Sequence, residues 1–415
     1  MVFQPFDPER DARHHRRRVI ALSLIGLTVL LAGQAALLRS WCRVDTRPPA
    51  WDQAIHLEIA WDYKNAISSG RWSEAFHPIP KPGMPAFPPL YHLALQAALG
   101  RPDVEHAALW VNYAYFVVLT FCLFGLAFEF MPRYKAAAAA AAFVCSSGVQ
   151  DLLLTQLVDL PVLTCSVAAF WAFVRSEEFS LWRPSLAFGA LFAVGMLHKW
   201  SFFSYMIPAY YVGIQALWRR GSTGPALAAF TVAAALTAPW YIANWPLLLP
   251  RLFQASADFA VPVWRGGVFF AYLWQSVDSL GPALWLMGWA GLLAARYPRK
   301  DHQTWLLAFW VLASYVFWAI VPNRQMRFLM PGLPGLAVAI CGTWPAGTIW
   351  ALLGVQALMA ANFAKGWIGP LSVPTPVAAL TLFSNNPPRR EQWPIDEILA
   401  EAERRRRPDE PVANL

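Results

Sequence analysis

The sequence predicts an all-α polytopic membrane protein with about eleven transmembrane helices, and two observations carry this prediction. First, 57% of the residues are hydrophobic and only 14% are charged, whereas soluble globular proteins carry roughly 25% charged residues. Second, several stretches of roughly 17 to 22 residues are almost free of charge, long enough to cross about 30 Å of hydrocarbon. One or two such stretches could be core helices of a soluble protein, but so many of them indicate a membrane.

The first span covers 19–38 and follows a strongly basic segment, 10–18. This apolar stretch is too long for the core of a signal peptide and lacks a clear small-residue cleavage site, so we expect it to be retained. Because basic residues near membrane ends favour the cytoplasm, the tail 1–18 is expected inside the cell, and the first helix leads outward.

The remaining apolar stretches are expected to cross the membrane in alternating directions. They cover 109–131, 136–149, 160–174, 185–197, 202–218, 225–242, 280–295, 305–321, 328–341 and 344–363. The even-numbered spans should end in the cytoplasm, where basic residues gather. The basic residues at those ends are Arg133, Lys135, Arg175, Arg183, Arg219, Arg220, Arg296, Arg299 and Lys300. An odd total then places the C-terminus outside.

The transmembrane domain, 19–365, is expected to carry three long outer segments, at 39–105, 150–159 and 244–279. The first of them is too long for a simple connector, and such loops are commonly functional. An outer tail, 366–415, follows, which could be a truncated soluble domain.

The first outer loop is expected to contain two helices that lie along the membrane surface. Before Ser69, Ile55, Ile59, Tyr63 and Ile67 repeat at four-residue spacing, which predicts an interfacial helix with its apolar stripe toward the membrane. A second short helix is expected over 90–99, and a short charged helix is expected over 395–407 of the tail.

Charge and cysteine patterns exclude several classes of protein. The net charge is +8, but the basic residues cluster at helix ends and in the tails and form no stripe with aromatic residues, so no nucleic-acid partner is expected. The cysteines show neither a disulfide framework nor a zinc spacing. No Gly-rich phosphate loop of the P-loop or dinucleotide kind is present.

Asp52 is the first acid after the first span, where Pro48-Pro49-Ala50-Trp51-Asp52 leads into a helix. Two interpretations stay open: the carboxylate caps that helix, or it carries chemistry at the outer face. His56 follows one helical turn later on the same face, so it could share a metal ion or a proton with Asp52, or it could be an interfacial histidine with its hydrogen bonds satisfied.

Asp159, in Leu-Val-Asp-Leu-Pro161, stands at the outer mouth of the fourth span. An acid beside hydrocarbon is costly, so its carboxylate should face the protein interior or a wet cavity. The alternative is again a helix cap, since Pro161 suits a first helical turn. Gln150 and Asp151 share that outer segment and are weaker candidates.

Three cations are also expected at the outer face. Lys199 stands between two apolar helices, where it could serve a site or snorkel to the interface. Arg324 and Arg327 follow the ninth span and are three residues apart, so they would be neighbours on a helix. Such a pair suits a phosphate, which Arg can bind bidentately, and interfacial anchoring is the alternative.

Taken in order, these residues resemble motifs of the GT-C superfamily of membrane glycosyltransferases, most closely the family 39 type. This group includes protein O-mannosyltransferases and lipid A aminoarabinose transferases. The motifs are Pro-Ala-Trp-Asp52, Phe-Pro-Pro-Leu-Tyr91, Leu-Val-Asp159-Leu-Pro, Gly-Met-Leu-His-Lys199, Ala-Pro-Trp-Tyr241-Ile-Ala-Asn and Asn-Arg324-Gln-Met-Arg327-Phe-Leu-Met-Pro. Each motif is short, and their order carries the resemblance.

The resemblance implies a GT-C-like fold and a glycosyltransferase that uses a polyprenyl-phosphate sugar donor, with inversion, at the outer face of the membrane. Asp52 would then be the general base or the carboxylate that orients the acceptor, and Asp159 would help to hold the reacting groups. Lys199 with Arg324 or Arg327 would neutralise the departing lipid phosphate.

The resemblance also implies supporting residues, a cofactor and partners. His56, Tyr91 and Gln53 would support the site, and Asp52 with Asp159 could bind a divalent cation such as Mg, Mn or Ca. No nucleotide cofactor would be needed. The acceptor would be a protein, a lipid or a glycan, and the protein would lie in the lipid bilayer of the plasma membrane.

Two departures from the family pattern bear on activity. Many relatives have Asp-Glu where this chain has Asp52-Gln53, which weakens a metal site that needs the second acid. Relatives also often continue into a folded outer domain after a segment like 393–399, and this chain ends soon after it.

Two other functions stay open from the sequence. A polytopic transporter or flippase for a lipid-linked or polar substrate would show paired repeats and polar residues near the middle of the membrane. An inactive GT-C-like scaffold is the other alternative. Convergence of Asp52, Asp159, Lys199 and Arg327 on one outward-facing cavity would favour the transferase.

Overall fold

The computed structural model describes residues 8–76, 87–219, 222–258, 267–294, 303–374 and 380–391, with 397, 400, 401 and 404. The first half contains α1 (Pro8–Cys42), α2 (Trp51–Ser68), α3 (Trp72–Phe76), α4 (Leu90–Leu95), α5 (Val104–Phe130), α6 (Arg133–Val144), α7 (Ser147–Leu153), α8 (Asp159–Arg175), α9 (Trp182–His198), η1 (Trp200–Met206) and α10 (Ile207–Ala216). The second half contains α11 (Thr223–Asp258), η2 (Val268–Phe270), α12 (Ala271–Leu280), α13 (Pro282–Ala294), α14 (Thr304–Ile320), α15 (Met326–Leu329), η4 (Met330–Gly332), α16 (Pro334–Thr343), α17 (Ala346–Lys365), β1 (Leu371–Val373) and β2 (Leu380–Leu382).

The predicted class, an all-α polytopic membrane protein, is confirmed. Every predicted span falls on one helix or on a run of consecutive short helices. Among the described residues, 4 helices are long and apolar enough to cross a membrane, and the pair α6 and α7, bent by 64°, would make 5. The helices α13 and α14 are shorter and apolar. The total of about eleven spans stays a prediction.

A run of alanines lets helices pack closely at the centre of the bundle. Residues 136–142 of α6 are all alanine, and all of them are buried. Small side chains allow neighbouring helix backbones to approach, which is the usual packing device where lipid removes the hydrophobic driving force. In the structure α6 contacts α1, α5, α16 and α17, and the charged residues lie at the ends of this bundle.

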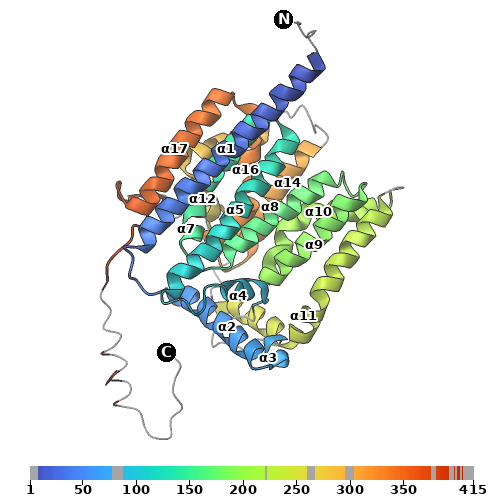
Figure 1. Ribbon diagram of the computed structural model, residues 1–415. Helices are drawn as coiled ribbons and strands as arrows, with labels where there is room; N and C mark the ends of the chain where they lie inside the picture. Colours follow the sequence, from blue (N-terminus) through green and yellow to red (C-terminus); the bar gives the residue numbers. More distant parts are fainter. Residues whose placement is uncertain are drawn as a thin grey trace, which may run out of the picture.

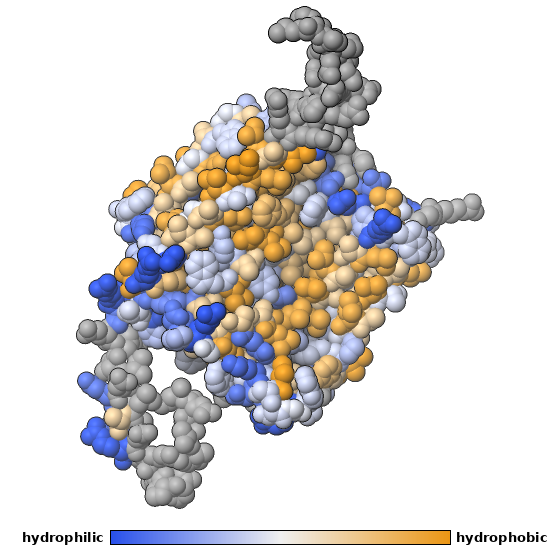
Figure 2. Space-filling view, in the orientation of Figure 1, coloured by the Kyte–Doolittle hydropathy of each residue, from blue (hydrophilic) through white to orange (hydrophobic). Residues whose placement is uncertain are grey.

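The two ends of the bundle differ in what they carry. At one end α1 and α17 finish side by side, because Lys365 Nζ donates to Ser40 Oγ at 2.9 Å, and α2 to α4 lie at the same end (Figure 1). At the other end, Arg175 pairs with Glu129 at 3.5 Å, and Arg219 pairs with Glu178. Apolar side chains cover the middle of the visible face between them (Figure 2).

Two expectations about the loops were wrong. The segment 244–279 is not one long loop: α11 continues to Asp258 through Pro246 and Pro250, and η2 and α12 follow after residues outside the described part. Proline is tolerated in such helices where neighbouring groups compensate for the lost hydrogen bond. The apolar stripe of α2 also packs inward, since Ile59 and Tyr63 are buried and α2 contacts α4.

The segment after α17 returns to the first loop. The strands β1 and β2 form an antiparallel pair, with Leu371 opposite Leu382, which the Pro-rich composition did not predict. Beyond them, Trp41 Nε1 donates to the Asn386 carbonyl at 2.8 Å, and the Thr46 amide donates to the Arg389 carbonyl at 2.9 Å. Most of the predicted tail helix 395–407 lies outside the described residues.

Candidate active site

Four charged side chains that are far apart in the sequence form one network. Arg327 Nη2 donates to Asp52 Oδ2 at 2.6 Å, and Arg327 Nε lies 3.7 Å from Asp159 Oδ2. Lys199 Nζ donates to the other oxygen of Asp159, Oδ1, at 2.6 Å. The network therefore runs from Asp52 through Arg327 and Asp159 to Lys199, and we call it the charged cluster.

The structure does not use either acid of the cluster as a helix cap. The N-cap of α2 is Ala50, the N-cap of α8 is Val158, and neither helix has a capping hydrogen bond from a side chain. Asp52 and Asp159 lie instead in the first turns, where the free amide groups and the helix dipole favour a negative charge. Their carboxylates turn to Arg327 and Lys199, so both are available to the same site.

Asp159 and Lys199 are more deeply buried than Asp52 and Arg327. The side chains of Asp52 and Arg327 are 31% and 20% exposed, whereas those of Lys199 and Asp159 are 10% and 4% exposed. Burial lowers the pKa of Lys199, and the Asp159 carboxylate opposes that shift. Lys199 does not snorkel to the interface, and Asp52 is the acid that a solvent-borne group reaches first.

Lys199 is directed into the site by the break between α9 and η1. Its backbone is extended, with φ −151° and ψ 131°, and its amide donates to the Gly195 carbonyl at 3.1 Å. A Cβ on Gly195 would lie 2.4 Å from the Phe202 ring, so the glycine allows η1 to fold back against α9. The lysine ammonium then lies 4.4 Å from the centre of the Phe328 ring.

Arg327 lies on α15, a single turn, and three other helices donate hydrogen bonds to carbonyls of the segment 325–331 around it. Tyr272 of α12 donates to the Gln325 carbonyl at 3.2 Å, and Tyr205 of η1 donates to the Phe328 carbonyl at 2.5 Å. Ser166 of α8 donates to the Pro331 carbonyl at 2.9 Å. These hydrogen bonds fix the segment, and with it the guanidinium, against the first turn of α8.

Among the described residues, no hydrogen bond or ion pair joins Arg324 to a member of the charged cluster. Its Nε and Nη2 donate to the Ala319 carbonyl at 3.1 and 3.0 Å, and its Nη1 donates to the Pro322 carbonyl at 3.3 Å. A cation that binds the free carbonyls at the C-terminal end of a helix, here α14, is a common terminator. Of the two arginines predicted for a phosphate, the structure therefore brings only Arg327 to the two acids.

His56 pairs with a second histidine that the sequence did not single out. His56 Nδ1 lies 3.0 Å from His92 Nε2, and His92 Nδ1 lies 3.3 Å from the Pro88 carbonyl. If His92 donates to Pro88, it accepts from His56, and this arrangement suits two neutral imidazoles. Tyr91 packs against His56 with ring centres 5.7 Å apart and donates to Asn112 Oδ1 at 3.1 Å. These residues support α2 beneath Asp52.

The histidine pair predicts a stability that depends on pH. Burial lowers the pKa of His92 to about 3 and that of His56 well below its usual value. Both imidazoles therefore stay neutral in the folded protein at a pH where the unfolded chain, with pKa values of about 6.5, takes up protons. The free energy of unfolding should fall by up to about 1.4 kcal/mol per pH unit for each imidazole as the pH drops below about 6.5.

Thermal unfolding in detergent between about pH 7.5 and about pH 5 checks this dependence. The variant His92→Gln removes one of the two groups and keeps a hydrogen-bonding side chain, so its unfolding temperature should change less with pH than that of the parent. Equal slopes for the two proteins would contradict a neutral buried pair.

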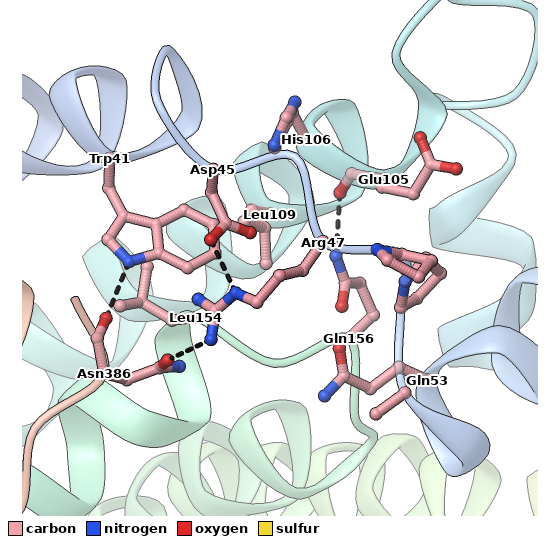
Figure 3. Close-up of a pocket in the computed structure, with 13 residues that line it drawn as sticks. Trp41, Asp45, Arg47, Gln53, Glu105, His106, Leu109, Leu154, Gln156 and Asn386 are labelled. Carbon is pink, nitrogen blue, oxygen red and sulfur yellow. Dashed lines mark hydrogen bonds and ion pairs between the residues drawn. The ribbon is translucent and has the colours of Figure 1, made fainter. Parts of the chain in front are cut away.

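Gln53 faces a separate polar pocket rather than the charged cluster. This pocket of about 130 Å³ lies between the end of α1, the start of α2 and the start of α5 (Figure 3). Arg47 crosses it, with Nε donating to Asp45 at 2.6 Å and Nη1 donating to Asn386 at 2.9 Å. Gln53 is thus next to Asp52 in the sequence but lines the neighbouring space.

The residues of the cluster fit a divalent cation poorly. Arg327 and Lys199 already engage both oxygens of Asp159 and one oxygen of Asp52, and a second acid that could complete a site is replaced by Gln53, which faces elsewhere. Among the residues that the structure describes, no group of three His, Cys, Asp or Glu side chains could hold a metal ion.

The comparisons with known proteins concern the fold of the chain. Residues 85–243 match the model of a family described as dolichyl-phosphate-mannose-protein mannosyltransferase. A structure of ArnT from Cupriavidus metallidurans in the apo state has a TM-score of 0.60 and 15% identity over 82% of this chain and 64% of that chain. The chain has the GT-C fold.

Two further GT-C structures are similar and contain a lipid phosphate. ArnT from the same organism bound to undecaprenyl phosphate has a TM-score of 0.58 and 15% identity, over 81% of this chain and 64% of that chain. The other structure is the archaeal oligosaccharyltransferase AglB from Archaeoglobus fulgidus in complex with an inhibitory peptide and a dolichol-phosphate. It has a TM-score of 0.51 and 12% identity, over 80% of this chain and 54% of that chain. No curated protein matches this chain by sequence.

The present chain spans less than two thirds of the length of the ArnT chain that it matches. The resemblance inferred from the motifs is confirmed by the family model and by these structures. The structure brings together four of the residues that the sequence singled out, namely Asp52, Asp159, Lys199 and Arg327, whereas sequence reasoning missed His92. The sequence signal that could have indicated His92 was its position directly after Tyr91, the last residue of the motif quoted above.

Proposed function

We propose that this GT-C protein is a glycosyltransferase that moves a sugar from a polyprenyl-phosphate donor to an acceptor at the outer face of the membrane. The observation that carries the proposal is the charged cluster, in which two carboxylates and two cations from four separate segments meet. A displacement at the sugar needs a base for the incoming group and cations for the departing phosphate. The cluster supplies both at one end of the bundle.

Asp52 is the general base in this proposal. The Asp52 side chain is more exposed than that of Asp159, so an acceptor hydroxyl or amine reaches it from the solvent side. As the acceptor attacks the anomeric carbon, its proton passes to Asp52, and the bond between that carbon and the phosphate oxygen breaks on the opposite side of the ring. The configuration inverts, and the electron pair leaves with the lipid phosphate.

Arg327 and Lys199 bind that lipid phosphate. Arg327 Nε is buried and has no hydrogen-bond acceptor among the described residues, and buried donors of this kind normally have a partner. A phosphate oxygen would supply one, and its second oxygen would compete with Asp52 for Nη2. Lys199 adds a second positive charge from the buried side of the site, where charge that develops on the leaving group is stabilised most strongly.

The order of binding follows from this competition. Without donor, Arg327 holds the carboxylate of Asp52 at 2.6 Å, so the guanidinium occupies an oxygen that would otherwise be open to the acceptor. A donor phosphate draws the guanidinium toward itself and releases Asp52 for the acceptor. We therefore propose that the donor binds first, and Asp159 keeps Lys199 and Arg327 in place throughout.

The remaining parts of the proposal concern cofactor, acceptor and location. The mechanism uses no nucleotide and routes no step through a metal ion, because the cations of the protein already occupy the two carboxylates. The acceptor is a protein, a lipid or a glycan. The protein lies in the plasma membrane with its N-terminus in the cytoplasm, so that the cluster and the first loop face outward.

The test is transfer from a panel of radiolabelled polyprenyl-phosphate hexoses and pentoses. The protein is placed in nanodiscs and supplied with a membrane extract, and label is then counted in the protein, lipid and glycan fractions. The parent and the control Arg71→Gln, whose arginine pairs with Glu74 on the surface, should both transfer, and Lys199→Met should not. Label that enters sealed vesicles unchanged, without any new covalent product, would favour a transporter instead.

A further inference from the structure

A wide cavity on the flank of the bundle lies apart from the charged cluster. It has a volume of about 760 Å³ and is lined by Arg39, Cys42, Arg43, Ala94, Ala97, Arg101, Asp103, His106, Ala107, Trp110, Val111 and Ala114. These residues come from the end of α1, from the segment between α4 and α5, and from the first turns of α5. None of the members of the charged cluster lines it.

Three arginines converge on this cavity without a protein partner. The side chains of Arg39, Arg43 and Arg101 make no hydrogen bond or ion pair with any residue that the structure describes. The one acid of the lining, Asp103, is 68% exposed and lies 3.8 Å from His106. Like charges that gather in one place repel each other, so an arrangement of this kind favours an anion between them.

The floor of the cavity is apolar and belongs to a membrane-spanning helix. Ala107, Trp110, Val111 and Ala114 line it and recur at three- and four-residue spacing on α5, so they share one helix face. Trp110 is 39% exposed, and α5 is long and apolar enough to cross a membrane. Cationic groups therefore line the same cavity as the apolar face of a helix that is long and apolar enough to cross a membrane.

This combination of a charged rim and an apolar floor fits an amphiphile with an anionic head. We propose that the cavity binds an anionic membrane phospholipid, with its phosphate between Arg39, Arg43 and Arg101 and its acyl chains along Trp110 and Ala114. Guanidinium groups bind phosphate oxygens bidentately, and a Trp at the interface packs against the region of the headgroup. The inference is independent of the sugar transfer proposed above.

A bound lipid would connect two parts of the chain that flank the catalytic loop. Arg39 and Arg43 lie at the end of α1, and Arg101 lies just before α5. The segment between them carries α2 and with it Asp52. A phosphate held by all three arginines would neutralise their mutual repulsion and fix the two ends of this segment to each other.

Native mass spectrometry of the full-length protein in detergent, titrated with the phospholipids POPG and POPC, tests the proposal. The parent should bind the anionic POPG in preference to the zwitterionic POPC. Affinity for POPG should fall by about fivefold for each Arg→Gln substitution at residues 39, 43 and 101, and by about a hundredfold for all three. The control Arg71→Gln with Arg390→Gln removes two exposed arginines outside the cavity and should bind POPG like the parent.

A second measurement keeps the test valid if the triple variant does not fold. POPG with brominated acyl chains should quench the fluorescence of the parent more than that of Trp110→Phe, since bromine in the groove lies beside that indole. Equal POPG binding by the parent and the arginine variants, or equal quenching with and without Trp110, would overturn the proposal. Loss of undecaprenyl phosphate binding in place of POPG binding would also overturn it, because the site would then belong to the carrier lipid.

Discussion

Replacing Asp52 by Asn should reduce sugar transfer by about a thousandfold without weakening the binding of the donor lipid. The amide keeps the shape of the side chain and can still contact Arg327, which now lies 2.6 Å from the carboxylate. It cannot accept a proton from the acceptor, so the bond to the sugar forms without a base. Single-turnover transfer from a preloaded donor, compared with a separate measurement of donor affinity, separates the two effects.

The matched control for this prediction is Glu58→Gln, which makes the same chemical change on the exposed side of the same helix, α2. Its transfer rate should equal that of the parent. If Asp52→Asn were as active as Glu58→Gln, Asp52 would have no part in proton transfer. If Asp52→Asn instead lost donor binding alone, the carboxylate would act only by positioning Arg327.

Breaking the buried pair of Asp159 and Lys199 should destabilise the protein by about 3 to 5 kcal/mol in either single variant. Their side chains are only 4% and 10% exposed, and their charged atoms are 2.6 Å apart. In Asp159→Asn the ammonium loses the carboxylate that it contacts, and in Lys199→Met the carboxylate keeps only the more distant Arg327, at 3.7 Å. The unfolding temperature in detergent measures the cost, which arises from an unpaired charge in a place that water hardly reaches.

The double variant Asp159→Asn with Lys199→Met completes a double-mutant cycle. Since it leaves no unpaired charge from this pair, its stability should recover to within about 2 kcal/mol of the parent, although transfer stays absent. Additive losses in the cycle would mean that the two groups do not depend on each other, and they would contradict the pairing. If the double variant regained stability but still lacked transfer activity, the pair would be needed for the function as well as for the fold.

The members of the charged cluster could be predicted because charge beside apolar helices is rare and costly. Asp159 and Lys199 each stand at the end of a long apolar stretch, and such groups must find a partner or water. The alternation of spans placed these ends on the same side of the membrane. The structure confirms that they meet, and the resemblance of the motifs to a known superfamily agrees with the observed fold.

Other features depended on contacts that no local pattern records. The choice between Arg324 and Arg327 was open in the sequence, and it is decided by the Ala319 carbonyl at the end of α14, which binds the first arginine. His92 pairs with His56 across 36 residues. The direction of Gln53 depends on a loop fastened by Asn386, far along the chain.

The burial of the α2 stripe and the continuation of α11 were missed for a related reason. Apolar periodicity indicates that a face is covered but not what covers it, so Ile59 and Tyr63 could be assigned to lipid while the structure packs them inside the protein. Pro246 and the polar residues around it weaken a helix prediction from sequence, yet α11 continues beyond them.

The most direct test of the account is a structure of the protein with undecaprenyl phosphate bound. The account predicts that the phosphate lies within hydrogen-bonding distance, about 3 Å, of Lys199 Nζ and the Arg327 guanidinium, and that Asp52 has separated from Arg327 and faces the solvent side. A phosphate bound elsewhere, with the contact between Asp52 and Arg327 still intact, would contradict it.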